Sequence, residues 1–270
     1  LHNALSGKFA QVKLESVHPS CNRVKITVID FLKESKLNSV KGPLTNIAIS
    51  AIREQIQKQR KAVIYRPKWA FPQTEEGILE IQQALAPTDV DIYDEIVQIE
   101  SLKYKPSLIV VLQGESLINA RDFRSEEKAI QTIIRLSSIV QRGKFDGELI
   151  VQTSVVRHNA FRYIAGKTDI LPLITERESI ALPPFYRLIK LVIKDNDPTH
   201  LQAKGEEIAK ILSKFNTESI LGPIPFSSEE GEQLIFQVSL KKDGELNKIK
   251  KGLAKALYNY NNLIVDVDPL

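Results

Sequence analysis

Three lysines on one predicted helix are the side chains in this sequence best suited to chemistry with phosphate groups. Lys248, Lys251 and Lys255 are three and four residues apart, which places them on a single helix face. Ammonium groups in such a row neutralise the phosphates of a nucleic-acid backbone without reading its bases. Lys241 and Lys242 lie shortly before the helix and extend the positive cluster. We predict phosphate contacts at these five lysines, although a merely solvated helix face would show the same spacing.

A second basic cluster is interleaved with aromatic residues. Arg66 and Lys68 alternate with Tyr65 and Trp69 at the end of a predicted strand. Aromatic rings beside cations are suited to stacking on unpaired bases, so this cluster is a second candidate for DNA contact. An aromatic residue at a strand end is also typical of a hydrophobic core, and that alternative stays open.

The sequence offers few residues that could carry catalysis or hold a metal. It has no Gly-x-x-x-x-Gly-Lys-Ser/Thr loop to cradle phosphates and no Asp-Glu-x-His motif. The four histidines are scattered, without a helical i, i+4 pair or a neighbouring cysteine, so we expect no metal site. We therefore predict no catalytic residues.

Charge is distributed unevenly along the 270 residues. Residues 1–70 hold 13 basic and 4 acidic residues, a net charge of +9, whereas residues 71–180 hold 12 and 17, a net charge of −5. A basic segment of this kind suits a phosphate backbone, and a lysine-rich solvated surface is the alternative.

The single cysteine, Cys21, excludes an intramolecular disulfide framework and favours the cytoplasm. No apolar run is long enough to span a membrane. Methionine is absent even at position 1, which suggests an incomplete chain or one from which methionines have been lost.

Hydrophobic patterns predict two kinds of sheet. After Thr45, a plausible helix cap, an amphipathic helix leads to an apolar strand at Ala62–Tyr65, and further apolar strands lie near 107–112 and 147–153. Apolar strands alternating with helices indicate an open α/β sheet. From about Arg177 the order changes to β-α-β-β-α-β, which is typical of a ferredoxin-like α+β sandwich.

Several segments resemble the PriA family of bacterial replication-restart helicases, also called primosomal protein N′. The segments are ERESIALPPFYRLIKLVI, LGPIPF and LIVDVDP in the last third, and ARDFRSEEKAIQTIIRLSSIVQRGKFDGELIVQTS before them. The earlier segment is similar to the last helicase motif of the family, an Asp-Phe-Arg-x-x-Glu helix that leads to an Arg-Gly-rich loop and a strand ending in Gln-Thr. The resemblance implies a RecA-like second helicase lobe followed by the family's C-terminal domain.

The resemblance also implies that the motor residues are degenerate. The family's Gln-x-x-Gly-Arg-x-Gly-Arg pattern falls on residues 135–142, where Ile139 replaces an arginine and only Arg142, followed by Gly143, is retained. An apolar side chain cannot stabilise charge on a transferring phosphoryl group. Of the family's loop that couples ATP hydrolysis to DNA, this sequence keeps only Gln98. The family's zinc-binding cysteine module would lie between Phe71 and Thr74, and the sequence lacks it there. We expect no ATP hydrolysis and no bound cofactor, although the family uses ATP.

Together these patterns predict a connector over residues 1–42, a degenerate RecA-like lobe over 43–172 and a DNA- or partner-binding domain over 173–270. The resemblance implies a protein that binds branched or single-stranded DNA at stalled forks, binds the tail of single-stranded-DNA-binding protein and other primosome proteins, and helps to reload the replicative helicase. Two alternatives stay open. One is a fragment of an active ATP-dependent helicase, and the other is a protein–protein scaffold, which the acidic residues Glu229, Glu230 and Glu232 would favour.

Overall fold

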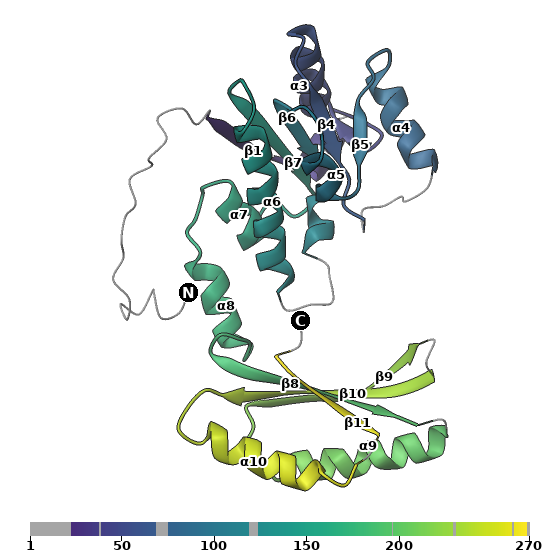
Figure 1. Ribbon diagram of the computed structural model, residues 1–270, viewed down its shortest axis with the longest axis vertical. Coiled ribbons are helices and arrows are strands. Elements are labelled where there is room, and N and C mark those ends of the chain that lie inside the picture. The colour runs from purple at the N-terminus through teal and green to yellow at the C-terminus, as the bar shows by residue number, and fades with distance from the viewer. Residues whose placement is uncertain are drawn as a thin grey trace. The chain divides into compact units, whose positions relative to one another are not determined.

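The computed structural model describes residues 23–37, 39–68, 75–118, 124–195, 197–228, 231–260 and 262–268. Two compact units divide between Ile170 and Leu171. We call them the parallel-sheet unit and the antiparallel-sheet unit, after the sheet that each contains (Figure 1). The predicted combination of an α/β region and a separate region with an antiparallel sheet is confirmed.

Five parallel strands form the sheet of the first unit, in the spatial order β1-β7-β6-β4-β5. Its central strands are runs of apolar residues; all four residues of β6, Leu-Ile-Val-Val, are buried. Such runs are typical of strands covered on both faces. The strands are β1 (Val24–Asp30), β4 (Ala62–Tyr65), β5 (Asp91–Tyr93), β6 (Leu108–Val111) and β7 (Gly147–Thr153).

Helices cover both faces of the parallel sheet. On one face α3 (Asn46–Gln57) and α4 (Glu75–Leu85) contribute isoleucine and leucine side chains to one core cluster. On the other face α5 (Ile96–Glu100), α6 (Ser125–Gln141) and α7 (Asn159–Ile164) contribute to a second cluster. The shorter elements of this unit are α2 (Phe31–Lys36), β2 (Val40–Lys41), β3 (Leu44–Thr45) and the 3₁₀ helix η1 (Gly114–Leu117).

The predicted connector, residues 1–42, contains a strand of the parallel sheet in its described part. Strand β1 lies within that range and pairs along its whole length with β7, from Val24 beside Gly147 to Asp30 beside Thr153. It is therefore an edge strand of the sheet. Its alternating pattern predicted a strand, but its partner lies more than a hundred residues away in the sequence, and nothing local indicates that pairing.

A buried glutamine joins β7 to the start of α3. The Gln152 side chain is 1% exposed. Its Oε1 accepts hydrogen bonds from the backbone N and the Oγ1 of Thr45, both at 2.8 Å, and its Nε2 donates to the Pro43 carbonyl at 2.9 Å. Thr45 is the helix cap that its position predicted, since its Oγ1 accepts from the Ala48 N–H at 3.2 Å. All the polar groups of this small network are thus satisfied inside the core.

The second unit has a four-stranded antiparallel sheet in the order β11-β8-β10-β9. Helices α9 and α10 both cover one of its faces (Figure 1) and bury Leu201, Ile208, Leu253 and Leu257 against it. The predicted β-α-β-β-α-β order is present. After α8 (Leu171–Ser179), its elements are β8 (Tyr186–Lys194), α9 (Pro198–Leu212), β9 (Ser219–Ser228), β10 (Gly231–Lys241), α10 (Leu246–Leu257) and β11 (Leu263–Val267).

We expect Gln152→Leu to lower the free energy of unfolding of the parallel-sheet unit by about 2–4 kcal/mol, because it leaves the Thr45 N–H and the Pro43 carbonyl buried without partners. Urea denaturation followed by circular dichroism measures this change. The matched control is Gln131→Leu, which removes an exposed glutamine from α6 and should leave the midpoint nearly unchanged. Equal midpoints for the two variants would show that the Gln152 network contributes nothing.

Candidate nucleic-acid interface

The lysines of α10 form an exposed face opposite its buried stripe. Lys248, Lys251 and Lys255 are all exposed, whereas Leu253 and Leu257 are 5% and 8% exposed. The helical period explains this division, because residues three and four apart share a face and the apolar face is packed against the sheet. The three lysines therefore share the solvent-facing side of α10, and DNA contact at this face stays a prediction.

Acidic neighbours leave this lysine face largely available. The Nζ of Lys248 lies 3.1 Å from Oε2 of Glu245, and both side chains are mostly exposed to solvent. A surface ion pair of this kind contributes little free energy, so a phosphate can replace the carboxylate at low cost. Lys241 and Lys242 are also exposed, at the end of β10. The Lys242 N–H donates to the Phe185 carbonyl at 3.2 Å, which holds the backbone there.

The described residues of the cluster around Arg66 offer no exposed aromatic ring for stacking. Tyr65 is 6% exposed and belongs to the core beneath α6, so its ring is not available to a base. Burial raises the pKa of its hydroxyl. Lys68 forms an ion pair with Glu95, whose hydrogen bond raises the pKa of the lysine. Arg66 is half-buried, and Trp69 lies outside the described residues.

The acidic stretch before β10 is described only in part. Glu232 is exposed, and its Oε1 accepts a hydrogen bond from the Ser227 hydroxyl at 2.7 Å across the β9–β10 pair. Glu229 and Glu230 lie outside the described residues. The carboxylate of Glu232 would repel a phosphate backbone at this end of the sheet.

The residues assigned to the degenerate helicase motif have structural roles. Ile139 is 1% exposed and lies in the core between α6 and the sheet, so this position faces away from solvent. Arg142 ends α6, and its Nε donates to the Ser138 carbonyl at 3.1 Å, while the Gly143 N–H donates to the Val140 carbonyl at 2.9 Å. These bonds satisfy carbonyls in the last turn of the helix.

Gln98, the remnant expected of a coupling loop, also stabilises a helix end. Its side-chain oxygen accepts from the Glu95 N–H at 3.2 Å, and the Glu95 carboxylate accepts in return from the backbone at Gln98, which makes a capping box at the start of α5.

Two polar contacts in the antiparallel-sheet unit were not predicted. Asp268 accepts from the Leu188 N–H at 3.0 Å and forms an ion pair with Arg187, which fixes the end of β11 to β8. Burial, and then the hydrogen bond to Glu207, raises the pKa of Tyr260 to about 12, so its hydroxyl remains protonated at neutral pH. Sequence spacing gave no signal for either contact, because each joins residues far apart in the chain.

Neither a metal cluster nor a membrane span occurs in the described part of the chain. No group of three or more histidine, cysteine, aspartate or glutamate residues there could hold a metal ion. Among the same residues, no helix combines the length and apolar character needed to cross a bilayer.

Comparison with known proteins shows similarity to one family over part of the chain. Residues 178–270 match the model described as the primosomal protein N C-terminal domain. The chain is 29% identical over 178 residues to Replication restart protein PriA from Synechocystis, 27% over 190 residues to that from Haemophilus influenzae and 25% over 175 residues to that from Chlamydia pneumoniae. These matches cover 60–61% of this chain and only 21–24% of the relatives. Residues 178–270 thus match the primosomal protein N C-terminal domain, and the similarity to PriA replication restart proteins supports a PriA C-terminal region.

Proposed function

We propose that this chain is a replication-restart factor that binds branched DNA at stalled forks and helps to reload the replicative helicase, without unwinding DNA itself. The observation that carries this proposal is the match of residues 178–270 to the primosomal protein N C-terminal domain. Single-stranded-DNA-binding protein and other primosome proteins are its proposed partners, by resemblance to the family.

In this proposal the two units have different tasks. The parallel-sheet unit corresponds to a degenerate RecA-like second helicase lobe, predicted over 43–172 and extended by the edge strand β1. The antiparallel-sheet unit corresponds to a ferredoxin-like domain that binds DNA or a partner, and its strand order supports this assignment.

The proposed DNA contact is the lysine face of α10, with Lys241 and Lys242 beside it. Five exposed ammonium groups within one unit can replace the counterions of several phosphates, and the release of those ions drives binding. A lysine ammonium lacks the planar, paired donors with which an arginine guanidinium binds a base edge through two hydrogen bonds. Binding should therefore be insensitive to sequence.

The absence of motor activity is proposed from the residues in the helicase motif. An isoleucine in the core cannot contact a phosphoryl group, and Arg142 is engaged with the last turn of α6. A catalytic arginine at such a site can contribute about 10³- to 10⁵-fold in rate.

Two other functions each have an observation in their favour. The chain spans only 21–24% of its relatives, so an ATP-binding lobe supplied elsewhere would make it part of an active helicase. The exposed carboxylate of Glu232 and the pairing of Lys68 with Glu95 reduce the positive surface, which favours a protein–protein scaffold.

Replacing Lys248, Lys251 and Lys255 together by glutamate should weaken binding to a DNA fork by roughly 1 kcal/mol or more for each lost phosphate contact, and should lower the slope of log affinity against log salt by about three. Fluorescence anisotropy of a labelled fork at several salt concentrations measures both quantities. The fold should persist, because the three side chains point away from the buried stripe.

The control is a second triple variant that carries Lys33→Glu, Lys210→Glu and Lys214→Glu. It changes the net charge by the same amount, at exposed positions outside the lysine face. It should keep a nearly unchanged salt slope. If the α10 variant melts like the parent protein and still binds the fork with parental affinity and slope, DNA does not contact this face.

The unmodified chain should not hydrolyse ATP, with or without fork DNA, and Ile139→Arg should not create this activity. The arginine would instead place an unpaired charge in the core and lower the free energy of unfolding by about 3 kcal/mol or more. A coupled ATPase assay and urea denaturation test these two expectations, with Ile139→Val as the conservative control. DNA-stimulated ATP turnover above that of a mock purification would favour the active-helicase alternative.

A further inference from the structure

The two edges of the antiparallel sheet differ in how they are protected. Edge strand β9 contains Pro223 and Pro225, which lack the N–H that another strand would need. The opposite edge, β11, has the sequence Leu-Ile-Val-Asp-Val and contains no proline. Among the described strands β11 pairs only with β8. An edge strand without proline can act as a template for another strand.

The register of β11 shows which of its backbone groups face outward. The Asp268 N–H donates to the Leu188 carbonyl at 2.7 Å, and the Lys194 N–H donates to the Asn262 carbonyl at 3.3 Å. In an antiparallel ladder such hydrogen-bonded pairs alternate with non-bonded ones, so the even-numbered residues of β11 bond to β8. The N–H and C=O groups of Val265 and Val267 therefore point toward the free edge.

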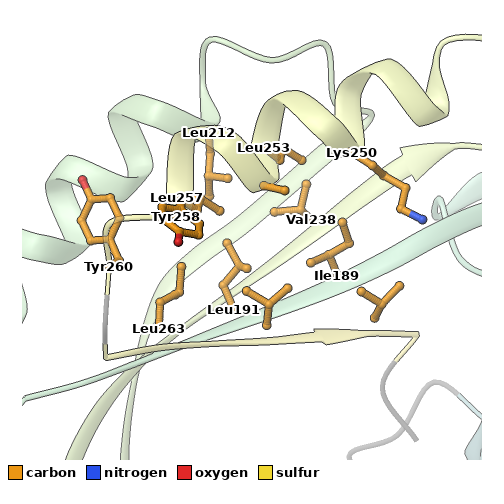
Figure 2. A pocket seen from close by; sticks show the side chains of 13 residues that line it. Ile189, Leu191, Leu212, Val238, Lys250, Leu253, Leu257, Tyr258, Tyr260 and Leu263 are labelled. Carbon is orange, nitrogen blue, oxygen red and sulfur yellow. The ribbon is translucent and has the colours of Figure 1, made fainter.

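An apolar groove lies beside this edge, between α10 and the sheet. It has a volume of about 380 Å³. Figure 2 shows Leu253 and Leu257 from α10 above Leu191 and Leu263 from the sheet, with Lys250 extending from α10 toward the sheet. Ala254, Val265 and Val267 also line it.

Apolar side chains at this edge remain exposed to solvent. Val265 is 52% exposed and Val267 is 42% exposed, although both point to the helix-covered side of the sheet. Tyr258, at the end of α10, is 83% exposed. A strand added beside β11 would place alternate side chains over the same groove, because side chains along a strand alternate between the two faces.

The positive charge at the groove distinguishes between two possible occupants, a second copy of this chain and an acidic segment of another protein. Lys250 lines the groove and places a positive charge at its border. A second copy of this chain, paired symmetrically through β11, would bring two such lysine-bearing helices together on one face of a joined sheet. A segment with carboxylates would instead meet opposite charge.

We propose that β11 binds an extended acidic segment of a partner protein by strand addition, with an apolar side chain of that segment in the groove beneath α10. Backbone hydrogen bonds to Val265 and Val267 supply affinity, and the groove with Lys250 selects the side chains. This site is separate from the proposed DNA face, because neither β11 nor Lys250 belongs to it. A failure of either proposal therefore leaves the other intact.

The test uses a fluorescein-labelled heptapeptide in which aspartate alternates with leucine or phenylalanine, and measures its binding to the whole chain by anisotropy. Val265→Pro removes an outward N–H but no bond to β8, since proline is tolerated where the N–H of an edge strand faces solvent. We expect this variant to melt like the parent and to lose binding about tenfold or more. The same peptide with lysine in place of aspartate should bind more weakly by a similar factor.

Ala254→Trp fills the groove and should abolish binding, whereas Ala203→Trp, on the exposed side of α9, should not. Both tryptophan variants and Val265→Pro should bind fork DNA like the parent, which separates this test from that of the lysine face. Parental peptide affinity in folded Ala254→Trp and Val265→Pro would overturn the proposal. So would a dimer in sedimentation that Val265→Pro disrupts, because a second copy would then occupy the edge.

Discussion

The packing of α10 against the antiparallel sheet determines how the rest of that unit meets its surroundings. Leu253 and Leu257 must be removed from water, and this single requirement sets the rotation of the helix about its axis. Once that rotation is set, Lys248, Lys251 and Lys255 can only face solvent, and Lys250 can only lie at the border between core and surface. The positive surface and the apolar groove are thus two results of one packing arrangement.

Local patterns in the sequence predicted most elements, and non-local contacts account for what was missed. The cap at Thr45 and the apolar strand at Ala62–Tyr65 were visible because each depends on neighbouring residues. The place of β1 in the sheet was not, since its partner β7 is distant in the sequence. Of the candidate site, the exposure of the α10 lysines could be predicted from helical period alone. The role of Gln152 could not, because it depends on which elements pack above it.

The helicase-like segment retains its shape while its polar residues serve the fold. Ile139 fills the core under α6, Arg142 and the Gly143 N–H satisfy the end of that helix, and Gln98 caps α5. Gly147, where β7 begins, is constrained just as strictly, because a Cβ there would lie 2.0 Å from a methyl carbon of Val140. These packing constraints set the local shape of the segment independently of any chemistry.

The contact between Asp268 and the start of β8 has a consequence for the energetics of recognition. Asp268 adopts a left-handed backbone conformation, with φ of 54°, and its carboxylate holds both the Leu188 N–H and the Arg187 side chain. At the other end of the strand the Leu263 N–H donates to the Tyr260 carbonyl at 3.2 Å. The last strand is therefore fastened at both ends and loses its conformational freedom when the domain folds. A molecule that docks along it meets a preorganised surface, and the entropy of ordering that strand does not weaken the complex.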